Sequence, residues 1–220
     1  LDAMLERAIL FFEEVSGNPV LLSMLVLVFS SCSDSESLPS SKSELYSRAT
    51  RAAMRKRLAP PGTLGDSESG LGRQPSSLDS QEVESMLRIL SRVAIAAHLA
   101  EKREFSGDLV QEALSSAQLT QWNTMLADAR GMPLVKVIEA GDGGASSFQF
   151  AHLSFQEGLF AKALADGSAA GAVRERLGSS HRKLLGNPWF LNALTIGGAA
   201  VGATLRVEGA VMSATKELVK

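Results

Sequence analysis

The first third of the chain has two stretches whose apolar positions predict helices. An almost continuous apolar run begins after Asn18 and Pro19 and extends to Phe29. Asparagine is a favoured N-cap, and proline suits the first helical position because its missing N–H would have no partner there. With apolar residues on every face, this helix is expected to be packed on all sides. A second helix is predicted from the capping-box sequence Ser41–Glu44 to about Arg57.

A proline-, glycine- and serine-rich stretch separates these helices from the next group. Residues 58–79 include Pro60, Pro61 and Pro75 and have little apolar content. Such composition does not provide enough apolar surface for a packed core. We therefore expect a mobile linker or surface insertion here, and a domain boundary.

Helical spacing then returns, and it is followed by an alternating pattern. One helix is predicted to begin at Asp79 or Ser80, a short one at Ser106, and a third to end before Gly131 and Pro133. The apolar stripe of the first of these comprises Val83, Met86, Leu87, Leu90, Val93, Ala94 and Ala97. The stripes of the other two comprise Leu109, Val110, Ala113 and Leu114, and then Leu119, Trp122, Met125 and Leu126.

Residues 134–139 and 148–152 have strand character and are joined by the glycine-rich turn 141–144, which predicts a β-hairpin. The capping-box spacing Ser154–Glu157 then starts another helix. Three helices followed by a hairpin are the layout of a winged helix. The expected fold is mainly α: a helical subdomain over 1–57, the linker over 58–79, a winged-helix domain over 80–166, and the first helices of a helical array over 167–220.

Composition agrees with a mainly helical globular chain and argues against export. Hydrophobic residues make up 45% of the 220 residues and aromatic residues only 5%. The single cysteine, Cys32, cannot form an internal disulfide, which favours a reducing, cytoplasmic location. The run Pro19–Phe29 is shorter than the ~20 residues that span a bilayer, and glycines and Asn192 dilute the stretch Trp189–Leu205. No membrane span is expected.

The charge distribution argues against nucleic acid as a partner. The formal net charge is −2. The helix ending at Arg130 has that single cation, and the hairpin sets Lys136 against Glu139 and Asp142. A basic cluster lies on a different helix and is interpreted as a solvated face near its C-terminus. It comprises Arg48, Arg51, Arg55, Lys56 and Arg57.

The motifs of independent catalysis are absent from the sequence. There is no G-x-x-x-x-G-K-[ST] phosphate loop, no H-E-x-x-H metal motif and no G-x-S-x-G nucleophile motif. The histidines His98, His152 and His181 fall on separate predicted elements. We therefore expect no catalytic residues and no metal site in this chain alone.

Two residues are candidates for ligand binding, each with a plainer alternative. In strand geometry His152 shares a face with Phe148 and Phe150, and it lies near the positive end of the helix that follows. Its ring could donate to a phosphate oxygen there, or it could be a half-buried strand histidine bonded to a carbonyl. Pro19 could pack against a flat heterocycle, or it could serve only as a first-turn helix residue.

Three sequence blocks together resemble the C-terminal half of the NACHT-type signal-transduction NTPases, of the STAND class. The blocks are Gly17–Leu25, Leu38-Pro39 with Glu44-Leu45-Tyr46, and the aromatic and histidine-containing run Phe148–Glu157. The resemblance covers about residues 10–165, and Asn187-Pro188-Trp189-Phe190 continues it into the helical region. Lys42 stands where an arginine is common in the family, and the insertion at residues 59–77 is long.

The resemblance implies a nucleotide-gated molecular switch. In the family, the winged helix closes over bound ADP, and exchange for ATP opens the protein and permits self-oligomerisation. Pro19 matches the proline near the adenine, and His152 matches the histidine that contacts the ADP phosphates. ADP or ATP with Mg would then be bound mainly by a P-loop lobe upstream in the same protein, a P-loop NTPase, and this chain would be its regulatory lid.

The lid interpretation requires the His152 imidazole to face the pocket floor around Asn18 and Pro19. The alternative is a helical and winged-helix scaffold for protein interaction that binds no nucleotide.

Overall fold

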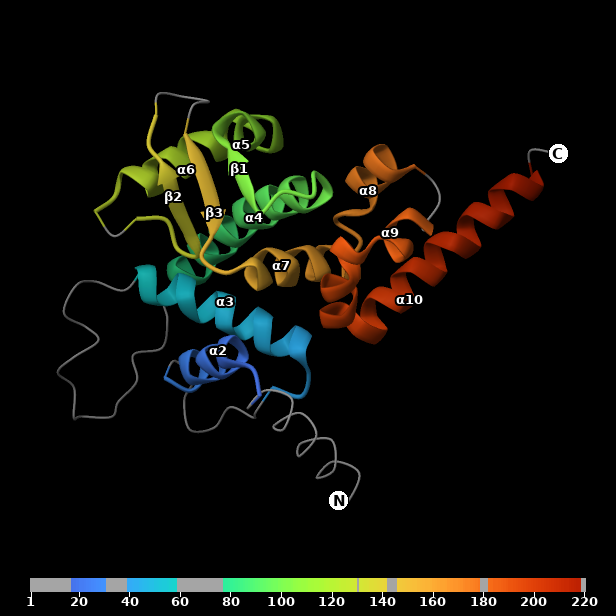
Figure 1. Ribbon diagram of the computed structural model, residues 1–220, viewed down its shortest axis with the longest axis horizontal. Helices are drawn as coiled ribbons and strands as arrows, with labels where there is room; N and C mark the ends of the chain where they lie inside the picture. Colours follow the sequence, from blue (N-terminus) through green and yellow to red (C-terminus); the bar gives the residue numbers. More distant parts are fainter. Residues whose placement is uncertain are drawn as a thin grey trace, which may run out of the picture.

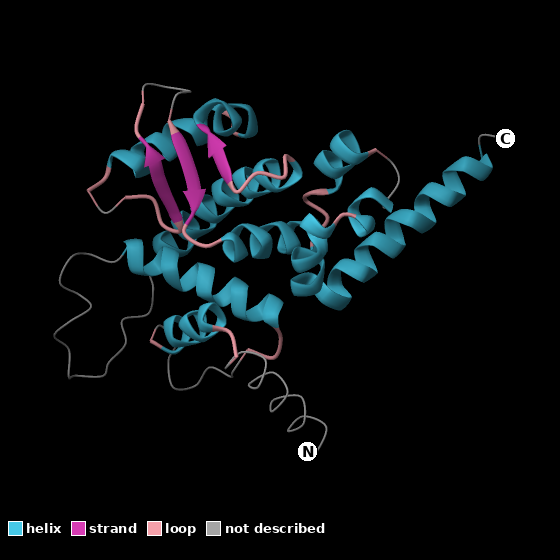
Figure 2. Cartoon of the chain, in the orientation of Figure 1, coloured by secondary structure: helices cyan, strands magenta, loops and turns pink. Residues whose placement is uncertain are grey.

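The computed structural model shows a mainly helical chain with one small antiparallel sheet (Figures 1 and 2). It describes residues 17–30, 39–58, 77–129, 131–141, 146–178 and 182–218. For residues 77–80 and 206–218 only the backbone is described. The predicted linker therefore falls almost entirely outside the described residues, as do Arg130 and His181.

The two N-terminal helices begin where local capping chemistry predicts. Helix α2 spans Pro19–Phe29 and helix α3 spans Lys42–Leu58. The Asn18 side chain accepts hydrogen bonds from the backbone N–H groups of Val20 (3.0 Å) and Leu21 (3.4 Å), which confirms the predicted start of α2. The two helices pack against each other at the lower side of Figure 1.

The expectation that α2 is packed on all sides is wrong. Leu21, Met24, Leu25 and Val28 are buried, whereas Leu22, Val26 and Phe29 are 45%, 58% and 52% exposed. The helix lies at the periphery of the described structure and buries only the side that faces α3 (Figure 1). One row of apolar side chains is therefore left on the surface.

The middle of the chain forms helices around a three-stranded sheet. In order these elements are α4 (Ser77–Leu99), β1 (Glu104–Ser106), α5 (Gly107–Ala113), α6 (Ser116–Ala127), β2 (Val135–Glu139) and β3 (Ser147–Phe150). The strand order is β1-β3-β2, with both pairings antiparallel. The hairpin is confirmed, and Ser106 caps α5 as predicted.

Strand β1 has no signal in the sequence pattern, and the predicted start of α4 is wrong. Three residues are too few to show alternation, and β1 exists through its pairing with β3, in which Phe105 lies opposite Phe148. Helix α4 begins at Ser77, ahead of the predicted Asp79 or Ser80. Its predicted apolar stripe is buried, apart from Leu87, which is half-buried.

The last third of the chain is helical, as predicted. Helix α7 spans Leu153–Ala165, α8 Ala170–Leu177, α9 Arg182–Gly186 and α10 Pro188–Leu218. Gly178 ends α8 with φ of +80°, and α10 bends at Gly198, where φ is +51°. Helix α10 packs along α7 and then extends away from the other elements (Figure 1). None of the described helices is long and apolar enough to cross a membrane.

Helix α7 contributes to both hydrophobic cores. Phe160 and Leu164 pack with α2, with the N-terminal part of α3 and with α8–α10, whereas Leu159 packs with α4 and the sheet. Leu45 of α3 lies in the first core and Met54, further along α3, in the second. The predicted subdomains therefore meet along α3 and α7, which contribute residues to both cores.

The interpretation of the α3 basic cluster as a solvated face is wrong for Arg57. Its guanidinium donates to the Gly131 carbonyl (2.7 Å) and pairs with Asp128 (3.0 Å), and its side chain is 10% exposed. Arg51 pairs with Glu84 on α4. The C-terminal half of α3 is thereby tied to α4 and to the segment between α6 and β2. Of the five residues of the basic cluster, only Arg55 and Lys56 are exposed.

Candidate functional site

His152 is the N-cap of α7. Its backbone is extended (φ −144°, ψ 142°), and its Nδ1 accepts a hydrogen bond from the Ser154 backbone N–H at 3.2 Å. The prediction that Ser154 caps this helix is wrong, since Ser154 lies inside the first turn and is buried. The expected face shared with Phe148 and Phe150 is also wrong. Strand β3 ends at Phe150, and the imidazole is exposed whereas both rings are buried.

The capping geometry determines which imidazole nitrogen carries the proton. Nδ1 accepts from the Ser154 amide and lies 2.6 Å from the Ser154 hydroxyl, so in the neutral ring the proton is on Nε2. Partial burial, and to a lesser extent the positive charge of Arg103, lower the pKa of His152 below its usual value. At neutral pH the side chain therefore presents an outward N–H donor beside the positive end of a helix 13 residues long.

Tyr46 on α3 supports this arrangement through Ser154. Burial raises the pKa of Tyr46, and the neighbouring Ser154 side chain partly opposes this rise. The Ser154 hydroxyl, 2.6 Å from Nδ1 of His152, is therefore also a neighbour of Tyr46. This connection couples the ring's orientation to the packing of α3 against α7.

Gly158 allows α3 and α7 to approach this closely. A Cβ atom at position 158 would lie 2.7 Å from Cδ1 of the Tyr46 ring, closer than van der Waals contact permits. Tyr46 is buried, so the ring has little room to move away. The glycine is thus required by the packing of the ring and not by backbone conformation.

We expect the Gly158→Ala substitution to lower the free energy of unfolding by about 1–3 kcal/mol through overpacking against Tyr46. Urea denaturation followed by circular dichroism measures the change. The matched control is Gly171→Ala in α8, where a Cβ would meet nothing within 4 Å. It should be neutral or slightly stabilising, because alanine is the better helix former. Equal effects of the two substitutions would contradict the steric account.

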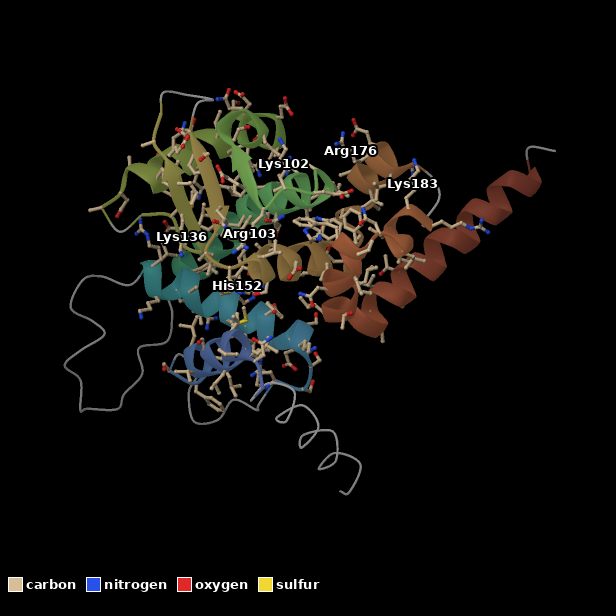
Figure 3. All side chains as sticks on the ribbon, viewed as in Figure 1. Lys102, Arg103, Lys136, His152, Arg176 and Lys183 are labelled. Carbon is tan, nitrogen blue, oxygen red and sulfur yellow. The ribbon has the colours of Figure 1, made fainter. Side chains whose placement is uncertain are left out.

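Two cations lie at the same end of the sheet as His152 (Figure 3). Arg103 immediately precedes β1, and Lys136 on β2 lies opposite Gln149 in the register. Both side chains are exposed, and neither forms an ion pair within the described part of the chain. Together with the N-terminus of α7, they give the surface around His152 a positive character.

Buried polar contacts hold the start of α7 in place. The Gln156 side chain donates to the Lys102 carbonyl (3.0 Å), which ties α7 to the segment that carries Arg103. Asn192 on α10 donates to the buried Glu157 carboxylate (2.5 Å). Burial raises the pKa of Glu157, and the hydrogen bond from Asn192 partly opposes this rise.

Pro19 is exposed at the first position of α2, as predicted from the helix signal. No hydrogen bond between described residues joins the Asn18–Pro19 segment to His152. Each lies at the N-terminus of a helix that packs on α3. The structure therefore brings His152 together with Ser154, Tyr46 and Arg103, whereas the predicted role of Pro19 at an adenine ring stays a prediction.

Tyr46, Gly158 and Arg103 were not among the predicted residues of this site. Tyr46 is 106 residues from His152 along the chain, by subtraction of their numbers, and no local pattern connects them. Glycine at position 158 inside a predicted helix was the one usable signal, because such a glycine is costly unless packing requires it. Among the described residues, no group of three or more potential metal ligands is found.

Compared with protein-family models, curated proteins and solved structures, the chain has no significant match. Its function must therefore be inferred from the geometry described above.

Proposed function

We propose that this chain is the regulatory lid of an ATP- and ADP-dependent switch of the NACHT type. The observation that carries the proposal is the capping geometry of His152. Its Nδ1 is engaged by Ser154, so its Nε2–H is oriented outward and remains an uncharged donor at neutral pH. A phosphate oxygen is a suitable acceptor for such a donor at a helix N-terminus.

The topology of residues 77–150 supports a winged-helix assignment. A helix, a short strand, two helices and a hairpin follow one another, and β3 lies between β1 and β2. In the proposal, residues 17–58 form the helical subdomain of the nucleotide-binding lobe, and the P-loop and Mg-binding residues belong to an upstream lobe of the same protein. A cytoplasmic location fits the single cysteine of the sequence.

The energy of one phosphate contact is sufficient for a switch. A hydrogen bond to a charged group contributes about 1.5–3 kcal/mol, which changes a two-state equilibrium tenfold or more. The closed, ADP-bound state would be favoured by this amount. Exchange for ATP would release the lid and permit self-oligomerisation.

The exposed apolar row of α2 supports both the lid and the scaffold alternative. Leu22, Val26 and Phe29 form a strip on one face, as their helical spacing requires, and such strips usually contact another protein surface. In the lid proposal the upstream P-loop part of the same protein covers the strip. In the alternative, a helical and winged-helix scaffold without nucleotide binding, a partner protein covers it.

Replacement of His152 by asparagine separates phosphate binding from helix capping. Asparagine is a good N-cap, so the start of α7 should be retained while the Nε2–H donor is lost. In the protein that carries this segment with its nucleotide-binding lobe, we expect His152→Asn to reduce retained ADP about tenfold and to increase self-association. Chromatography of nucleotide released from the purified protein measures the first effect, and light scattering the second.

His152→Ala loses both the donor and the cap, so it should add a loss of stability to the same loss of ADP. Unchanged ADP content and oligomeric state in His152→Asn would reject the lid proposal. In that case the scaffold alternative would be retained.

A further inference from the structure

A groove of about 930 Å³ lies where α3, α4 and α7 meet, and His152 does not line it. Its floor includes the buried side chains of Tyr46, Ile95 and Leu159. Small-molecule sites have volumes of about 300–1,000 Å³ and combine an apolar floor with a few convergent polar groups. The groove has both the size and the apolar floor of such a site.

Among the charged side chains that line the groove, two arginines have no ion-pair partner in the described residues. Glu84 is paired with Arg51, and Asp166 lies 3.3 Å from the Lys162 ammonium group. Both carboxylates of the lining are therefore neutralised by cations of the same lining. Arg88 and Arg92 also line the groove, and neither has an ion-pair partner among the described residues.

Arg88 and Arg92 are placed to bind the same anionic group. They lie four residues apart on α4, so their side chains project from the same face of the helix. Each guanidinium is permanently charged and can donate two parallel hydrogen bonds to an oxyanion. The groove therefore has an excess of positive charge at a single location.

Hydroxyl groups on two helices add neutral donors to the lining. Ser43 and Ser47 are four residues apart on α3, and Ser91 lies between the two arginines on α4. None of the three side chains has a hydrogen-bond partner in the part of the chain that the structure describes. Hydroxyl groups that line the same groove as the two guanidinium groups are suited to the remaining oxygens of a phosphate.

We propose that this groove binds a small organic phosphate. The phosphate would bind to Arg88 and Arg92 and to the neighbouring serines, while the apolar part of the ligand packs over Tyr46 and Leu159. The groove shares Tyr46 and Gly158 with the site around His152, but its phosphate-binding residues are different, and it does not depend on the proposed nucleotide switch. The apolar floor makes a ligand with a ring or hydrocarbon portion a better fit than inorganic phosphate alone.

The test uses 1-naphthyl phosphate as the probe and the whole chain as the receptor. Tyr46 is the only tyrosine in the sequence, so ¹³C-labelled tyrosine gives a single ring signal that reports on the groove floor. We expect saturable binding by calorimetry and a concentration-dependent shift of the Tyr46 signal. We also expect 1-naphthol and inorganic phosphate each to bind at least tenfold more weakly. No saturable binding, or equal affinity for 1-naphthol, would overturn the proposal.

The double variant Arg88→Gln/Arg92→Gln should bind 1-naphthyl phosphate at least tenfold more weakly, because charge-assisted hydrogen bonds are lost. Both side chains are exposed, so the fold should be retained, which circular dichroism and the melting temperature check. The matched control, Arg55→Gln/Lys56→Gln, removes the same charge from exposed positions of α3 outside the groove and should bind normally. Equal affinity in the two double variants would reject the assignment of the site to the two arginines.

Discussion

Acidification from pH 7.5 to 4.5 is expected to lower the free energy of unfolding by about 2–3 kcal/mol through His98 alone. Burial lowers the pKa of His98 from 6.5 to about 4. The side chain is 0% exposed and lies among the rings of Phe160, Trp189 and Phe190, with centroids 4.6, 5.3 and 5.4 Å away. No carboxylate hydrogen-bonds to this imidazole in the described part of the chain. A proton on the ring would therefore create a buried positive charge without a hydrogen-bonded anionic partner among these residues.

The sign of the effect follows from the two protonation equilibria. Above pH 6.5 the histidine is neutral in both the folded and the unfolded states. Its full contribution to the free energy of unfolding is then present. As the pH falls from 6.5 towards 4, the unfolded state binds a proton that the folded state excludes, so stability is lost in this window. Below about pH 4 the folded state is protonated as well, and the loss levels off.

Comparison with His98→Gln isolates this contribution. Glu44 and Asp166, whose pKa values are lowered, also reduce stability at acidic pH, whereas Glu157, whose pKa is raised, acts in the opposite direction. These groups are present in both proteins. Urea denaturation of each at pH 7.5, 6, 5 and 4.5 should therefore show a steeper pH dependence in the wild type. Parallel curves would show that His98 is not the titrating group.

Trp122→Ala is expected to lower the free energy of unfolding by about 3–5 kcal/mol, the range for a truncated buried aromatic side chain. Trp122 is 1% exposed and meets the Phe148 ring edge-on, with centroids 5.5 Å apart and planes at 87°. Since whole domains are stable by only about 5–15 kcal/mol, the variant should be close to unfolding at 37 °C. Thermal and urea denaturation measure the change.

The Trp122 substitution also affects the candidate site, because Phe148 lies on β3, which leads directly into His152 and α7. Trp122→Phe should recover part of the stability, since it keeps an aromatic ring against Phe148. Leu191→Ala, at a position 62% exposed, is the surface control and should change stability by less than about 0.5 kcal/mol. A similar loss in Trp122→Ala and Leu191→Ala would contradict the proposed packing role.

Helix ends and breaks were predictable because their chemistry is local. Asn18 with Pro19, Ser106, and the break before Pro188 each depend on groups within a few residues of one another. The apolar stripe of α4 was predictable for a similar reason. Side chains three or four residues apart share a helix face, whatever packs against that face.

The start of α7 shows why a local signal can mislead. Ser154 and Glu157 have the capping-box spacing, yet the Ser154 hydroxyl lies 2.6 Å from His152 Nδ1 and next to Tyr46, and the Glu157 carboxylate accepts from Asn192. Tyr46 and Asn192 come from α3 and α10, far away in the sequence. The N-cap of α7 is instead His152, whose side chain accepts a hydrogen bond from the Ser154 backbone N–H.

The residue pattern of this chain specified a mainly helical protein with one hairpin, because periodicity and caps depend on near neighbours. The structure shows what depends on distant residues: the strand β1, the exposed row of α2, and the network of Tyr46, Ser154 and His152. It also places Arg88 and Arg92 in a groove formed by three helices. Such features require surfaces from separate segments to meet, and sequence spacing does not encode which surfaces meet.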